Sequence, residues 1–71
     1  MANRKQQIAE LQKKAGELAQ EIEDLASEME DALENMPESI RYSSRGDIMQ
    51  ERIDLLEGWA DELDTMADEV L

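Results

Sequence analysis

Apolar residues recur along two long stretches of the chain, at alternating spacings of three and four residues. In the first stretch they are Ile8, Leu11, Ala15, Leu18, Ile22, Leu25, Met29, Ala32 and Met36. In the second they are Met49, Ile53, Leu56, Ala60, Leu63, Ala67 and Val70. This repeat is typical of helices that pack along a coiled-coil seam. It predicts an all-α protein with two long amphipathic helices.

Residues with turn and capping preferences place the ends of these helices. Asn3 followed by Gln6 fits a cap on the first helix, and Pro37 prevents that helix from continuing. Ser44 followed by Asp47 fits a capping box on the second. The short connection forces the helices antiparallel, with room for one extra helical turn after Pro37. We therefore expect a single domain over residues 1–71, with a first helix at about 3–35, a turn at 36–44 and a second helix at about 45–70.

The second helix carries another apolar strip beside its seam. This strip consists of Ile48, Leu55, Trp59 and Met66. A narrow apolar seam packs against one partner helix, whereas a wider apolar stripe usually packs against two. A chain of 71 residues without cysteine also has few means of stabilising itself except association. We therefore predict an antiparallel helical hairpin that dimerises through this strip into a four-helix bundle.

The charge balance excludes several partners. The chain has 19 acidic and 7 basic residues, for a net charge of −12. Direct binding to nucleic acid or to an anionic membrane is disfavoured, because both require clustered cations. No apolar run approaches the ~20 residues of a transmembrane helix, and the N-terminal residues do not resemble a secretory signal. We expect a cytoplasmic protein.

Catalysis is not indicated by the residues present. The chain has no histidine, no cysteine and no glycine-rich phosphate loop. Carboxylates at short helical spacings are common, but the Glu-Glu-x-x-Glu and Glu-x-x-His elements of all-α metalloenzymes are absent. We expect a non-enzymatic chain without a metal or another cofactor, in which most acids lie on solvated helix faces.

The interhelical turn concentrates basic and hydroxyl residues in an otherwise acidic chain. Helix N-termini accept anions, and arginine recognises phosphate with two hydrogen bonds. A candidate anion site therefore consists of Arg41, Tyr42, Ser43, Ser44, Arg45, Gly46 and Arg52. In the alternative interpretation these arginines only neutralise acids at the end of the first helix, and the serines are ordinary caps.

The acids themselves form long negative rows. The candidate acidic face consists of Glu17, Glu21, Glu28, Asp31, Glu34, Glu51, Asp54, Asp61, Glu62 and Asp68. Rigid rows of acids can imitate DNA and occupy the cationic cleft of a nucleic-acid enzyme. The alternative is a solvated surface that keeps the protein from aggregating.

Residues 34–57 carry three motifs in succession. They are Glu34-Asn35-Met36-Pro37-Glu38 at the helix stop, Ser43-x-Arg45-Gly46-Asp47 at the next helix start, and Ile53-Asp54-x-Leu56-Glu57 in the heptad that follows. This stretch resembles small acidic helical proteins of phages and prophages, in which leucine takes the place of Met36. The resemblance implies phage origin and a counter-defence role inside an infected or lysogenic bacterial host.

These features lead to three functional expectations. The first is a counter-defence binding protein that sequesters a small anionic nucleotide signal at the turn. The second is an acidic inhibitor or DNA mimic that occupies a basic cleft of a host nucleic-acid enzyme. The third is a structural or assembly coiled coil. In each case the chain also pairs with itself.

Overall fold

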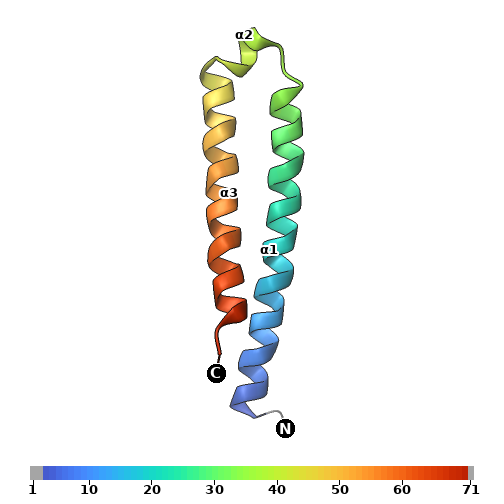
Figure 1. Ribbon diagram of the computed structural model, residues 1–71, viewed down its shortest axis with the longest axis vertical. Helices are drawn as coiled ribbons and strands as arrows, with labels where there is room; N and C mark the ends of the chain where they lie inside the picture. Colours follow the sequence, from blue (N-terminus) through green and yellow to red (C-terminus); the bar gives the residue numbers. More distant parts are fainter. Residues whose placement is uncertain (1–2, 71) are drawn as a thin grey trace.

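The computed structural model describes residues 3–70, which form a helical hairpin (Figure 1). Its elements are α1 (Arg4–Glu34), the short α2 (Glu38–Arg41) and α3 (Ser44–Asp68). The two long helices lie side by side and antiparallel, with α2 at the tip and both termini at the opposite end (Figure 1). The hairpin is a rod of 58 × 15 × 14 Å. Within the described residues there is no strand, so the predicted all-α hairpin is confirmed.

The ends of α1 are set as its sequence predicts, but the start of α3 is not. The Asn3 side chain accepts from the Gln6 N–H at 2.8 Å, and the Asn3 N–H donates to the Gln6 side chain at 3.2 Å, which completes a capping box. The capping box expected at Ser44 and Asp47 is wrong. Ser43 is the N-cap of α3, and no side chain caps this helix. The Ser43 hydroxyl instead donates to the carbonyl of Ile40 in the preceding turn.

The seam between the helices differs from the predicted one at five of the eight predicted positions in α1, namely Ile8, Leu11, Leu18, Leu25 and Ala32, which are exposed. The buried apolar residues are Ala15, Ala19, Ala26 and Leu33 of α1 and Ile53 and Ala60 of α3. Leu11, Leu18 and Leu25, which the heptad assigned to the seam, are 46–63 % exposed. Relative to the predicted seam, the buried side of α1 is rotated toward alanine residues, because small side chains let the two helix backbones approach closely.

The open end of the hairpin shows this close approach. A Cβ on Gly16 would lie 3.7 Å from the Cβ of Ala67, an ordinary packing distance. Beside this pair, the Gln12 side-chain amide donates to the carbonyls of Met66 at 3.1 Å and Glu69 at 2.8 Å. These bonds add to the Glu69 N–H that also donates to the Met66 carbonyl, and they satisfy acceptors at the end of α3. The contacts fix the register, with Gly16 and Ala67 at one level along the rod.

The core of this hairpin is small. Ile53 is the largest fully buried side chain, and it forms a buried cluster with Ala26 and Leu33. The partly buried side chains that pack against this cluster are Met29, Met36, Met49 and Leu56. The accessible surface is 5673 Å². A compact monomer of this mass would expose only about 4,500 Å². The rod therefore leaves unusually much surface open, part of it apolar.

Within residues 3–70, no helix combines the length and the apolar character that a membrane crossing requires.

Candidate functional site

One side of the hairpin carries an apolar face built from both long helices. We define it as Leu11, Leu18 and Leu25 of α1 with Ile48, Leu55, Trp59 and Met66 of α3. The α3 members are 47–54 % exposed. Leu11 and Met66 line one shallow groove, and Met29, Leu55 and Trp59 line another. The strips of the two helices therefore lie on the same side of the rod.

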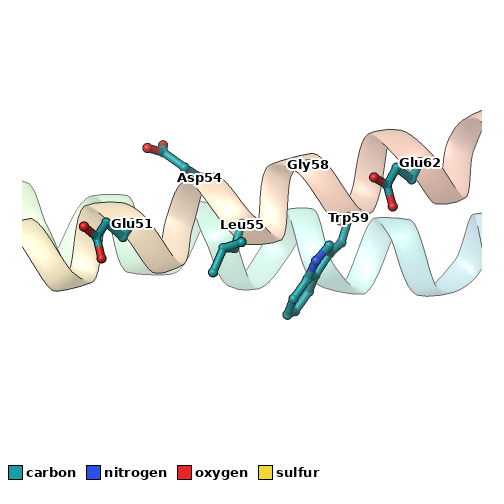
Figure 2. Close-up of a pocket in the computed structure, with 6 residues that line it drawn as sticks. All are labelled: Glu51, Asp54, Leu55, Gly58, Trp59 and Glu62. Atoms are coloured by element: carbon teal, nitrogen blue, oxygen red, sulfur yellow. The ribbon is translucent and has the colours of Figure 1, made fainter.

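The close-up of α3 shows how this face is bordered (Figure 2). Leu55 and Trp59 point to the same side of the helix, whereas Asp54 points away from them (Figure 2). Glu51 and Glu62 line an open groove along α3 together with Leu55 and Trp59. An exposed tryptophan and leucine between carboxylates resemble the apolar core and polar rim of a protein interface.

The other side of the hairpin carries a groove lined by acids. We call it the acidic groove: Glu23 and Ser27 of α1 with Glu57 and Asp61 of α3. Glu57 is two residues from both Leu55 and Trp59, which places it about 160° around α3 from them. The apolar face and the acidic groove therefore lie on opposite sides of the molecule.

Two carboxyl groups meet across the helices at the acidic groove. A side-chain hydrogen bond with Glu30 of α1 raises the pKa of Glu57 above its ordinary value of 4.5. Repulsion from Glu30, Asp54 and Asp61 raises this pKa further. Negative charge is thus dense enough here to favour a bound proton, and a positively charged partner would relieve the same repulsion between the carboxylates.

The ten acids of the predicted acidic face are all exposed, but they do not form one face. All of Glu17, Glu21, Glu28, Asp31, Glu34, Glu51, Asp54, Asp61, Glu62 and Asp68 lie at the surface. Glu51 and Glu62 border the apolar face, whereas Asp61 belongs to the acidic groove. The acids surround the rod and leave mainly the apolar strip free of negative charge.

The interhelical turn brings only part of the predicted anion site together. Arg45 and Arg52 line one groove with Ile40 and Ile48, in which Met29, Met36 and Met49 also take part. Arg41 is not in this groove. Its guanidinium lies 5.2 Å from the ring centre of Tyr42, which is largely exposed. Among residues 3–70, the buried Nε of Arg41 has no hydrogen-bond partner.

The small residues of the turn have structural roles. Gly46 is buried, and a Cβ there would lie 1.8 Å from the carbonyl oxygen of Arg41. Glycine is thus required for α2 to fold against α3. The Ser43 hydroxyl is bonded to Ile40, and Ser44 is exposed in the first turn of α3. Over the described part of the chain, no group of three or more acids is arranged to hold a metal ion.

Sequence reasoning missed the α1 half of the apolar face and the cluster of Glu23, Glu30 and Glu57. Leu18 and Leu25 fit a heptad seam as well as Ala19 and Ala26 do. The signal that separates them is the seven-residue spacing of small residues on both helices: Ala19 and Ala26 on α1, and Ala60 and Ala67 on α3. Once that seam is assigned, Glu23, Glu30 and Glu57 fall beside it on one edge.

Comparison of the chain with protein-family models, with curated proteins and with solved structures gives no match.

Proposed function

We propose that this chain is a non-enzymatic binding protein that pairs with a second copy of itself and presents acidic outer surfaces to a basic protein partner. The observation that carries the proposal is the separation of the two sides of the hairpin. Burial of the apolar face between two copies would complete a four-helix bundle. The two acidic grooves would then lie on the outside of that bundle.

The exposed area supports pairing. The rod exposes about 1,200 Å² more than a compact monomer of its mass. A stable interface of standard size buries about 800 Å² per partner. The excess surface is therefore sufficient for a dimer interface, and the half-exposed side chains of the apolar face provide its apolar centre.

The charge of the pair supports a basic partner. Each chain carries a net charge of −12 along a rod of 58 Å. Two copies side by side would carry about one net negative charge per ~2.4 Å, compared with one per ~1.7 Å in duplex DNA. Such a rod competes for the cationic clefts of nucleic-acid enzymes. The resemblance to small phage proteins leads us to propose counter-defence as its setting.

The test is displacement of DNA from a basic protein. A fluorescent 20-base-pair duplex is bound to an HU-type architectural protein, and this chain is added at low and at high salt. We expect displacement at low salt that weakens as salt rises. The triple variant Glu23→Gln, Glu57→Gln, Asp61→Asn should displace less than the wild type.

A matched control separates the acidic groove from net charge. The triple variant Glu10→Gln, Glu17→Gln, Asp31→Asn removes the same charge elsewhere on the rod. It should retain most of the displacement. Absence of displacement at low salt, or an equal loss in both triple variants, would contradict the proposal.

A second candidate function is capture of a small anionic nucleotide, and the groove shared by Arg45 and Arg52 is the observation that favours it. Cyclic di- and trinucleotides should then raise the Tm, and Arg45→Glu should abolish the rise. An unchanged Tm with every nucleotide, or an equal rise in the variant, would exclude this groove as the site.

A further inference from the structure

The outward strip of α3 continues beyond its apolar residues in a regular order. From Arg45 to Met66, positions spaced alternately by three and four residues lie on one side of α3, and Glu69 continues the spacing just beyond the last helical residue, where the backbone is extended. These positions are Arg45, Ile48, Arg52, Leu55, Trp59, Glu62, Met66 and Glu69. All are exposed. The charged members are arginines in the first half and glutamates in the second. This strip is a complete heptad seam that the hairpin itself leaves uncovered.

The strip is symmetric about the level of Glu57. Leu55 and Trp59 lie two residues to either side of that level, and Arg52 and Glu62 lie five residues to either side. The same relation joins Ile48 to Met66 and Arg45 to Glu69. A two-fold rotation at this level therefore places apolar residues against apolar ones and arginines against glutamates.

We propose that the second copy docks with its α3 antiparallel to this α3, around a two-fold axis at the level of Glu57. Leu55 then packs on the partner's Trp59, and Ile48 packs on the partner's Met66. Arg52 pairs with the partner's Glu62, and Arg45 lies at the level of the partner's Glu69, just beyond the end of α3. Two-fold symmetry forms each of these contacts twice. The arrangement rests on the self-association proposed above and assigns its orientation.

The alternative arrangement, in which the two turns meet at one end of the dimer, sets α3 against the partner's α1. The contact of Gly16 with Ala67 places Glu21 level with Glu62, and Asp31 level with Arg52. That arrangement would therefore oppose one pair of like charges and one pair of opposite charges. Antiparallel docking of α3 on α3 instead sets each charge of the strip against its opposite and the apolar members of the strip against one another.

Charge reversal tests the orientation. In antiparallel docking, Arg52→Glu and Glu62→Arg each create two like-charge contacts, so each variant should weaken the dimer about tenfold. An equimolar mixture of the two variants should recover an affinity near that of the wild type. In the mixed dimer, every charge at position 52 faces the opposite charge at position 62. Asp61→Arg makes a similar change on the far side of α3 and should leave the affinity within about twofold.

The outcomes separate this arrangement from self-association itself. Sedimentation velocity would measure each dissociation constant, and circular dichroism would establish that each variant keeps its helices. A wild-type chain that stays monomeric overturns both proposals. A wild-type dimer that Glu62→Arg tightens, or whose two variants do not rescue each other, overturns the antiparallel docking alone.

A distance measurement gives an independent reading. The chain has no cysteine, so Ser44→Cys provides a single attachment point for a nitroxide at the turn end of α3. In antiparallel docking the two labels lie about 40 Å apart, because 26 residues of helix separate their levels. Labels within about 20 Å of each other would show that the turns meet and would overturn the arrangement.

Discussion

Gly46 packs directly against the backbone of Arg41, so closely that a Cβ on Gly46 would lie 1.8 Å from the Arg41 carbonyl oxygen. Neither atom is at the end of a flexible side chain, and the corner between α2 and α3 must open to admit a methyl group. We expect Gly46→Ala to lower the free energy of unfolding by about 1–3 kcal/mol. Urea unfolding followed by circular dichroism at one protein concentration would measure this change.

Gly58 provides the matched control. A Cβ at Gly58 meets nothing within 4 Å, in the middle of the same helix. Gly58→Ala should therefore raise the free energy of unfolding by about 0.5–1 kcal/mol. Opposite signs for the two substitutions would support the described corner. A neutral Gly46→Ala would show that α2 does not fold against α3 in this way.

The assignment of the seam predicts unequal effects for neighbouring apolar residues. Ile53 is fully buried at the centre of the core, so Ile53→Ala should cost about 2–5 kcal/mol. Leu55 is about half exposed in one hairpin and belongs to the apolar face. Leu55→Ala should change unfolding less than Ile53→Ala but should weaken self-association more. Equal effects on unfolding at dilute concentration would mean that the seam is wrongly assigned.

Glu57 predicts that mild acid stabilises the hairpin. Its folded pKa is raised above 4.5 by Glu30, so the folded state binds a proton more readily than the unfolded state. Stability is therefore lowest above the folded pKa and rises as the pH falls through it toward 4.5. Thermal melts between neutral pH and pH 5 should show a rising Tm. Glu57→Gln should raise the Tm at neutral pH and flatten this dependence, whereas Glu17→Gln should leave the dependence intact. A Tm that falls on mild acidification would contradict the described contact.

Much of the hairpin could be predicted because its signals are local. The Asn3 capping box and the break at Pro37 depend on residues a few positions apart. The seam could not be assigned from periodicity alone, because Leu18 and Ala19 each complete a heptad with Ala15 and Ile22. Only the packing of small residues across the two helices decides between them.

The candidate surfaces were less predictable for the same reason. The apolar strip of α3 could be recognised from spacing, but its neighbours Leu18 and Leu25 could not be assigned to it before the seam was known. The turn shows the opposite error. The sequence places Gly46 in a candidate anion site at a helix N-terminus, whereas its packing against Arg41 explains the glycine without any ligand.

Trp59 reports directly on the apolar face. It is the only tryptophan of the chain and is half exposed in one hairpin. Self-association should bury it, so its fluorescence maximum should shift to shorter wavelength as the protein concentration rises. Leu55→Glu should remove this shift, and Asp61→Glu, in the acidic groove on the other side of α3, should preserve it. A maximum independent of wild-type concentration would argue against an interface at Trp59.

Sedimentation equilibrium of the wild-type chain across the micromolar range tests the pairing most directly. The chain has a mass of 8.1 kDa. We expect a mass of about 16 kDa at the upper concentrations, and dissociation on dilution that Leu55→Glu shifts to higher concentration. A folded helical species of 8.1 kDa at every concentration would contradict the account, because the apolar face would then be stable without a second copy.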